Sequence, residues 1–400
     1  MIAYLGSLVS SMLGVMAITF AIIAIGYLLG AVEIKGVSLG SAGVLVVALA
    51  YGVLVNFVPS FTIGETEIIL FSDAVKSQFS TISGIGTAMF VTSVGLIAGP
   101  KFFRSFNKKT MAYLVMGIII IAIASIVGII IIKCFNVDAA MVIGIMTGAL
   151  TSTPGLAAAK EVGTAVQQDA AVAGYGIAYL YGVLGVVLFV QIIPKLLKID
   201  IAKEREAFTA ANTVSVKPIT GKLVNVEPFG FFPFCLAIAF GYVIGSITIP
   251  GINFSLGASG GTLVAGLIVG HFGHIGALNC TINKNTLRFF RELGLVLFLA
   301  GAGVPGGVNF VDNVKLSYFI YGIILTTVPM IVGFLLAKYV FKLSIFNNLG
   351  SITGGMTSTP ALGALISTAG TDDVSSAYAA TYPLALVSVV LASKLIIMFC

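Results

Sequence analysis

The tetrapeptide Thr-Ser-Thr-Pro occurs twice in the chain, and in both copies a hydroxyl residue precedes a proline. A hydroxyl side chain can cap a helix and proline suits the first helical position, so Thr153 and Thr359 are expected as N-caps. A helix N-terminus carries unpaired N–H groups and the positive end of the helix dipole, which attract a carboxylate. The motifs therefore predict two substrate-binding ends, formed by Thr151, Ser152, Thr153, Pro154, Thr357, Ser358, Thr359 and Pro360.

Three further groups of residues could line a cavity beside these motifs. Paired tyrosines share one helix face after each motif, two arginines begin a later helix, and a glycine precedes each motif. These residues are Tyr175, Tyr179, Tyr378, Tyr382, Arg288, Arg291, Gly148 and Gly354. Other interpretations stay open: tyrosines can pack or form an interfacial belt, arginines can anchor a helix at the cytoplasmic face, and Ser or Thr can bond a neighbouring helix.

Lys160 and Glu161 follow the first motif, whereas the second copy has Ile366 and Ser367 at the matching places. A charged residue inside a membrane is a functional candidate. An adjacent pair near the outer mouth can also be solvated, so no role is assigned to it. The spans around the motifs are expected to hold no embedded Asp or Glu, which a proton-driven cation exchanger would need. This pattern favours an anionic or zwitterionic substrate.

The composition excludes a soluble globular domain. Of 400 residues, 58% are hydrophobic and only 9% are charged, against about 25% charged in an ordinary soluble domain. The net charge of +6 lies in short clusters between apolar runs long enough to span a bilayer as helices. These clusters indicate topology and not nucleic-acid binding. Cys134, Cys235, Cys280 and Cys400 form neither a disulfide framework nor a zinc pattern, and no metal site is assigned.

The membrane part is duplicated. Residues 144–156 match residues 350–362 at 8 of 13 positions, including both Thr-Ser-Thr-Pro motifs. Other matches follow in the same order and pair Gly86 and Phe90 with Gly294 and Phe298. We therefore expect three parts: an N-terminal membrane repeat (1–194), a cytoplasmic linker (195–228) and a C-terminal inverted membrane repeat (229–400).

The basic clusters predict the topology, because Lys and Arg collect in cytoplasmic loops. One cytoplasmic loop holds Lys101, Arg104, Lys108 and Lys109, and the linker holds Lys195, Lys198, Lys203, Arg205, Lys217 and Lys222. The spans 112–132 and 170–194 already return the chain to the same side, so the segment 137–168 should be a re-entrant hairpin broken at the motif.

Five spans and one hairpin per half place the second half upside down relative to the first, with both termini outside. The predicted fold is therefore an all-α polytopic membrane protein with two inverted repeats of about five transmembrane helices each. Each repeat contains a re-entrant broken-helix hairpin. Inverted repeats with broken helices occur in many secondary transporters, which bind substrate at the midplane between the repeats.

The duplicated motifs, the polar linker and the inverted five-span repeats resemble the aspartate:alanine exchanger family of bacterial permeases. This resemblance implies a dimeric inner-membrane secondary transporter for small carboxylates such as aspartate, alanine or succinate. It also implies that the eight motif residues are the substrate-site positions. Typical members carry soluble regulatory domains in the central cytoplasmic loop. The short linker of this chain predicts that such regulation is absent.

Together these features predict a secondary transporter that alternates access by an elevator motion of its hairpin-bearing core against a dimerising scaffold. The expected partners are a small organic anion or amino acid, the lipid bilayer and a second copy of the chain. No cofactor is expected apart from a possible coupling Na⁺. A Na⁺- or H⁺-coupled symporter or antiporter, or a channel, is the alternative.

An enzymatic function is not predicted. Gly257-Ala258-Ser259-Gly260 is a GxSG sequence of the kind found in intramembrane serine proteases, and His271 and His274 follow it. A nucleophile needs a base within hydrogen-bond reach. His271 lies twelve residues after Ser259, and this spacing corresponds to about 18 Å along a helix.

Overall fold

The computed structural model describes residues 14–34, 37, 38, 40–63, 66–102, 111–202, 204, 205, 223–249, 254–308, 310, 315–371 and 374–400. The described chain is mostly helical. Five of its helices are long and apolar enough to cross a membrane: Asp73–Pro100, Met111–Phe135, Ala165–Leu196, Leu316–Tyr339 and Ser376–Phe399. The protein is therefore a multi-pass membrane protein. Other predicted spans correspond to apolar helices of 16 residues, such as Val15–Gly30 and Phe231–Ser246.

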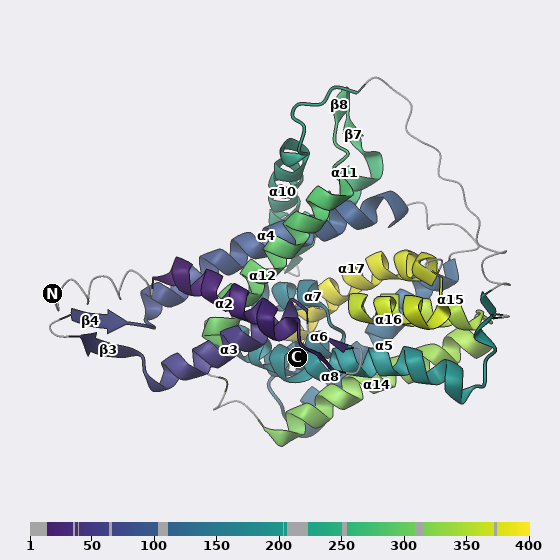
Figure 1. The fold of residues 1–400 in the computed structure, drawn as a ribbon, viewed down its shortest axis with the longest axis horizontal. Coiled ribbons are helices and arrows are strands. Elements are labelled where there is room, and N and C mark those ends of the chain that lie inside the picture. The colour runs from purple at the N-terminus through teal and green to yellow at the C-terminus, as the bar shows by residue number, and fades with distance from the viewer. Residues whose placement is uncertain are drawn as a thin grey trace.

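The helices form two series with the same order (Figure 1). The first series contains α2 (Val15–Gly30), α3 (Ala42–Phe57), α4 (Asp73–Phe102), α5 (Met111–Phe135), α6 (Ala139–Ala149), α7 (Thr153–Val162) and α8 (Ala165–Leu196). The second contains α10 (Phe231–Ser246), α11 (Gly257–Phe272), α12 (Lys284–Val308), α14 (Leu316–Tyr339), α15 (Ile345–Gly355), α16 (Thr359–Ala369) and α17 (Ser375–Phe399). In both series the fifth and sixth helices are short and are joined at a Thr-Ser-Thr-Pro motif.

Small β-hairpins connect the first three helices of each series. The predicted all-α fold did not include them. Each hairpin has two antiparallel strands. They are β1 (Glu33–Ile34) with β2 (Val37–Ser38), β3 (Ser60–Ile63) with β4 (Thr66–Ile69), β5 (Thr248–Ile249) with β6 (Phe254–Ser255), and β7 (His274–Ile275) with β8 (Leu278–Asn279). The hairpins occupy the same places in both series.

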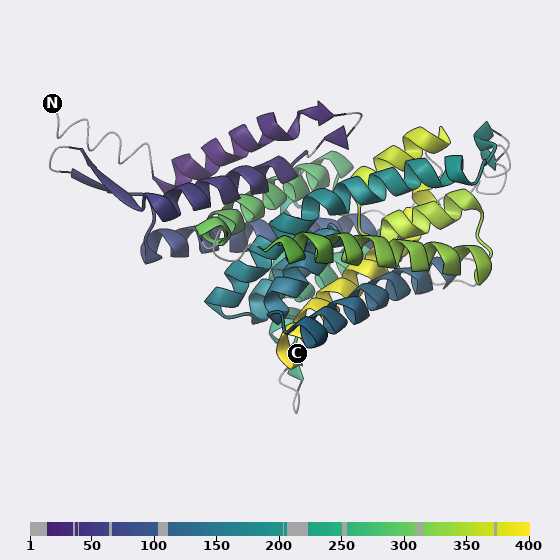
Figure 2. The same cartoon turned by 90° about the horizontal axis from the view of Figure 1, so that it is seen from below.

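The helices pack into two bodies. The six-helix body consists of α2, α3, α4, α10, α11 and α12, which contact mainly one another. The eight-helix body consists of α5, α6, α7, α8, α14, α15, α16 and α17, and its buried apolar core includes side chains from nearly all of them. In Figure 1 the six-helix body lies to the left and at the top, and the eight-helix body lies to the right; Figure 2 shows them from below.

Contacts between the two series are reciprocal. α11 packs on α4 as α3 packs on α12, and α17 packs on α7 as α8 packs on α16. At the crossing of α4 and α12, a Cβ on Gly86 would lie 2.3 Å from the backbone N of Phe298, and one on Gly294 would lie 2.4 Å from that of Phe90. Only glycine permits this approach. Gly86 thus approaches Phe298 as Gly294 approaches Phe90. A two-fold relation between the series produces such paired contacts.

Candidate functional site

The first Thr-Ser-Thr-Pro motif forms the tip where α6 turns into α7. Ser152, and not Thr153 as predicted, is the N-cap of α7, and its hydroxyl accepts a hydrogen bond from the N–H of Gly155 at 3.3 Å. Ser358 caps α16 in the same way, with the N–H of Ala361 at 3.4 Å. The cap is shifted by one residue because the threonine before it already closes the turn.

That threonine has an unusual backbone conformation in both motifs. Thr151 has a φ of 53° and Thr357 a φ of 51°, in the left-handed region that β-branched residues seldom adopt. Such strain costs about 1–3 kcal/mol and persists where the surrounding structure imposes it, often at functional sites. Here the conformation ends the short helix before each motif: the N–H groups of Thr151 and Ser152 bond back to the carbonyls of Gly148 and Thr147, and Thr357 and Ser358 bond back to Gly354 and Thr353 in the same way.

The two tips are hydrogen-bonded to each other. The hydroxyl of Thr151 donates to the carbonyl of Met356 at 3.2 Å, and the hydroxyl of Thr357 donates to the carbonyl of Leu150 at 2.8 Å. All of these residues are buried. Residues 207 positions apart in the sequence are therefore bonded, and the two reciprocal bonds form a buried joint between the tips.

Thr153 has a different partner. Its hydroxyl lies 3.0 Å from the phenol oxygen of Tyr175, which is 1% exposed. The ring of Tyr175 stacks at an angle on that of Tyr179, with 5.1 Å between centroids. Tyr378 and Tyr382 form the matching stack in the second series, with 5.0 Å between centroids. Tyr175 thus lies beside the first tip, and Tyr382 lines a cavity together with Thr357 of the second tip.

A cavity of about 350 Å³ lies beside the joined tips, between the two bodies. We call it the tip cavity. The eight-helix body contributes Thr151, Thr153, Pro154, Tyr179, Thr357 and Tyr382. The six-helix body contributes Phe90, Val94, Arg291, Glu292 and others. Three threonines of the motifs and the half-buried Arg291 therefore line the same cavity.

Glu292 adds a carboxylate to this cavity, and it accepts a hydrogen bond from the phenol of Tyr27 at 2.9 Å. The sequence predicted no embedded acid near the motifs, so this residue corrects that expectation. Glu292 was overlooked because it lies in the charged first half of α12, which the sequence assigned to topology.

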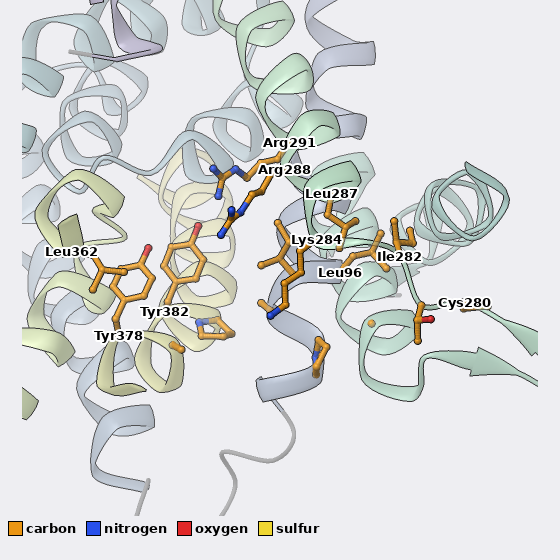
Figure 3. Close-up of a pocket in the computed structure, with 17 residues that line it drawn as sticks. Leu96, Cys280, Ile282, Lys284, Leu287, Arg288, Arg291, Leu362, Tyr378 and Tyr382 are labelled. Carbon is orange, nitrogen blue, oxygen red and sulfur yellow. The ribbon is translucent and has the colours of Figure 1, made fainter. Parts of the chain in front are cut away.

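A second cavity of about 480 Å³, the vestibule, continues along α12 and also separates the two bodies. Lys284, Arg288 and Arg291 line one wall, Tyr378 and Tyr382 line the other, and none of its described lining residues is acidic. In Figure 3 both arginines point across the vestibule toward the hydroxyl of Tyr382. Arg291 and Tyr382 line both cavities, so the vestibule leads to the tip cavity.

Several predicted residues lie elsewhere. Gly148 and Gly354 do not line either cavity; they allow α6 and α15 to approach the backbones of Tyr175 and Tyr378. Ser152 and Ser358 are fully buried as helix caps. The side chains of Thr359 and Pro360 lie outside the described part of the structure, although the backbone places Thr359 at the start of α16.

The structure also pairs charges that sequence reasoning missed or left solvated. Lys394, which is 1% exposed, forms an ion pair of 2.6 Å with Glu161. Lys76 forms another of 2.7 Å with the buried Asp169. Only the spacing of Lys394 inside an apolar helix could have identified it. Within the described ranges, no group of His, Cys, Asp and Glu could hold a metal ion.

Comparison with known proteins adds a family. The family model described as Predicted Permease Membrane Region (Asp-Al_Ex) matches residues 18–195 and 233–398. An uncharacterized transporter of Bacteroides fragilis is 25% identical, with 93% of this chain and 96% of that protein covered. An uncharacterized transporter of Desulfotalea psychrophila is 26% identical, with 93% of this chain and 95% of that protein covered. A putative transport protein of Glaesserella parasuis is 24% identical, with 90% and 94% covered.

These alignments run over 528 to 536 positions, more than the 400 residues of this chain. The relatives therefore contain residues that have no counterpart here. The two stretches matched by the family model leave out residues 196–232, which include all of the linker 195–228 except its first residue.

Proposed function

The chain belongs to the Asp-Al_Ex family of permeases and is a membrane transporter, and we propose that it exchanges or exports small carboxylates or amino acids by alternating access. The observation that carries this proposal is the tip cavity, where Arg291 faces the hydroxyl-rich tips. A guanidinium group can bind a carboxylate through two parallel hydrogen bonds. Aspartate, alanine and succinate are small enough for a cavity of about 350 Å³.

The tips can contribute in two ways. Pro154 has no N–H and the N–H of Gly155 is bonded to Ser152, so the first turn of α7 offers fewer free donors than predicted. The positive end of the helix dipole is still directed at the tip. Thr151, Thr153 and Thr357 line the cavity as well. The motif residues thus provide polarity around a site whose full positive charge comes from Arg291.

We also propose that the two series are inverted repeats and that each short helix pair is a re-entrant hairpin. The reciprocal packing at Gly86 and Gly294 supports a two-fold relation. Five other helices per series make the number of crossings odd, which orients the second series opposite to the first. The proposed parts are then the repeats 1–194 and 229–400, joined by the cytoplasmic linker 195–228, with both termini outside the bacterial inner membrane.

The position of both cavities supports an elevator motion. Residues from both bodies line each cavity. If the eight-helix body slides along the six-helix body, the tips can carry a bound anion from one side of the membrane to the other. In this proposal the six-helix body is the scaffold through which two copies form the homodimer that the family resemblance implies.

One observation favours ion coupling as a second candidate function. Glu292 places a carboxylate beside Arg291 in the tip cavity. An embedded carboxylate can bind Na⁺ or a proton, as coupled symporters and antiporters require. Coupling and exchange then use the same cavity.

Counterflow in proteoliposomes tests the proposal. Vesicles loaded with a panel of dicarboxylates and amino acids are assayed for uptake of the labelled compounds, with and without a Na⁺ gradient. Uptake that requires internal substrate supports exchange. Uptake driven only by Na⁺ or H⁺ supports the coupled alternative, and the absence of carboxylate or amino-acid transport contradicts the proposal.

Replacing Tyr175 with Phe tests the contribution of the first tip. The change removes the hydroxyl that contacts Thr153, and a buried neutral hydrogen bond contributes about 1 kcal/mol. We expect the half-saturating substrate concentration in counterflow to rise about fivefold. Tyr181→Phe is the matched control, because Tyr181, which like Tyr175 does not line the tip cavity, bonds Thr327 on α14 and not a motif residue. Equal effects of both substitutions would contradict a local role for Tyr175.

A further inference from the structure

The space between the two bodies is open at one end and closed at the other. Along α4, the vestibule is lined by residues 96–100 and the tip cavity by Phe90 and Val94. Toward the opposite end of the helix, Ser83 and Lys76 instead bond groups of the eight-helix body. α17 shows the same order, from the vestibule at Tyr378 through Leu386 to the ion pair at Lys394.

The closed end contains the repeat counterpart of the tip cavity. The tip cavity is bordered by Phe90 and Arg291, and their counterparts under the repeat are Phe298 and Ser83. Between these counterparts lies the side chain of Lys160. Its Nζ donates to the hydroxyl of Ser83 at 3.2 Å and lies 5.6 Å from the ring centroid of Phe298. Lys160 of the first hairpin thus occupies the space that stays open on the vestibule side.

Glu161, the residue after Lys160, connects the two bodies at the same end. Glu161 on α7 and Lys394 on α17 form their ion pair against the turn that starts α11, in the other body. Glu161 accepts a hydrogen bond from the N–H of Ser259, and Lys394 donates to the carbonyl of Leu256. Gly257 has a φ of +65°, and a Cβ there would lie 2.1 Å from the Glu161 carboxylate. Because glycine has no side chain, the ion pair can pack directly against the backbone at Gly257.

A third contact spans the bodies at this end, between Lys76 on α4 and Asp169 at the start of α8. All three contacts are made by residues just beyond the first tip, in α7 and the start of α8. The second series has Ile366 and Ser367 in place of Lys160 and Glu161. The matching glycine of the α3 turn, Gly40, has no atom within 4 Å of its Cβ position. These contacts between the two bodies are therefore present at one end only.

We infer that Lys160, Glu161, Lys394 and the Lys76–Asp169 pair form a gate that closes the pathway opposite the vestibule and must open when the eight-helix body moves. This inference rests on the proposed alternating access. The Glu161–Lys394 pair is the strongest part of the gate, because removing Glu161 leaves the charge of the buried Lys394 without its carboxylate. Lys394 would then reach water most readily in the state in which this end is open.

Cysteine accessibility tests the gate without any substrate. Ala158, fully buried between the bodies, is replaced with Cys in a protein whose four native cysteines are replaced with Ser. A membrane-impermeant maleimide is applied to vesicles of each orientation. Glu161→Gln should raise the labelling rate of this cysteine tenfold or more, from the face opposite to the one that labels Thr281→Cys in the vestibule. An unchanged rate, or labelling from the vestibule face, would overturn the inference.

Two matched comparisons separate gating from misfolding. Gly257→Ala should raise the labelling rate as Glu161→Gln does, whereas Gly40→Ala carries the same left-handed backbone strain without touching the ion pair and should not. A cysteine at Ala124, buried within the eight-helix body alone, should stay unreactive in every variant. Reactivity at Ala124, or equal effects of both glycine variants, counts against the gate. Increased labelling together with failed counterflow would retain the gate and contradict the proposed substrate class.

Discussion

Replacing Arg291 with Gln is expected to raise the half-saturating substrate concentration about 100-fold. Arg291 is the basic side chain that lines both the vestibule and the tip cavity. A hydrogen bond to a charged group contributes about 1.5–3 kcal/mol, and about 1.4 kcal/mol corresponds to a factor of ten in affinity. The measurement is counterflow of aspartate or succinate, whichever the wild-type protein takes up.

Arg288→Gln is the matched control for this prediction. Arg288 lies one turn earlier on α12, is exposed and lines only the vestibule. Its loss should weaken attraction of the anion to the vestibule and raise the half-saturating concentration only severalfold, with a stronger effect at low salt. If both substitutions had the same effect at every salt concentration, Arg291 would only attract anions electrostatically and would not bind the substrate.

The double substitution Thr151→Val with Thr357→Val is expected to reduce transport about 100-fold. It removes both hydrogen bonds between the tips and leaves the carbonyls of Leu150 and Met356 buried without these donors. An unsatisfied buried polar group costs about 1–3 kcal/mol. Valine also retains the branched Cβ that disfavours a positive φ, so nothing offsets the loss. Initial counterflow rates at saturating substrate measure the effect.

Thr147→Val is the control for the tip prediction. Thr147 is also a buried threonine, but its hydroxyl bonds to Ile143 and Gly144 within its own helix. We expect its transport rate to stay within about twofold of wild type, because the tip contact remains. Full transport by the double variant would show that the tips work without their reciprocal joint. Each single variant should show an intermediate transport rate, because one of the two hydrogen bonds between the tips remains.

The sequence predicted the repeated architecture well because it is encoded locally. Each Thr-Ser-Thr-Pro interrupts an apolar segment, and the structure shows two short helices at each of these places, α6 with α7 and α15 with α16. The matches of Gly86 and Phe90 with Gly294 and Phe298 coincide with the reciprocal crossing of α4 and α12. Motif identity and glycine spacing depend on neighbouring residues and can be read without coordinates.

Contacts between distant segments could not be predicted in this way. The bond between Thr357 and Leu150 joins residues 207 positions apart, and the ion pair of Glu161 joins it to a lysine 233 positions away. No periodicity of a single helix specifies either partner. The N-cap was misplaced by one residue: Thr151, with its positive φ, follows the end of α6, and Ser152 rather than Thr153 caps α7.

Substrate protection of a cysteine in the tip cavity tests the central claim most directly. Ser41, whose side chain lines this cavity and is partly exposed, is replaced with Cys in the variant lacking native cysteines. Maleimide labelling is measured with each compound of the counterflow panel, and Ser77→Cys on the exposed surface of α4 is the control. Transported compounds should slow labelling at position 41 and leave position 77 unchanged. Equal labelling with and without a transported compound would place its binding site elsewhere.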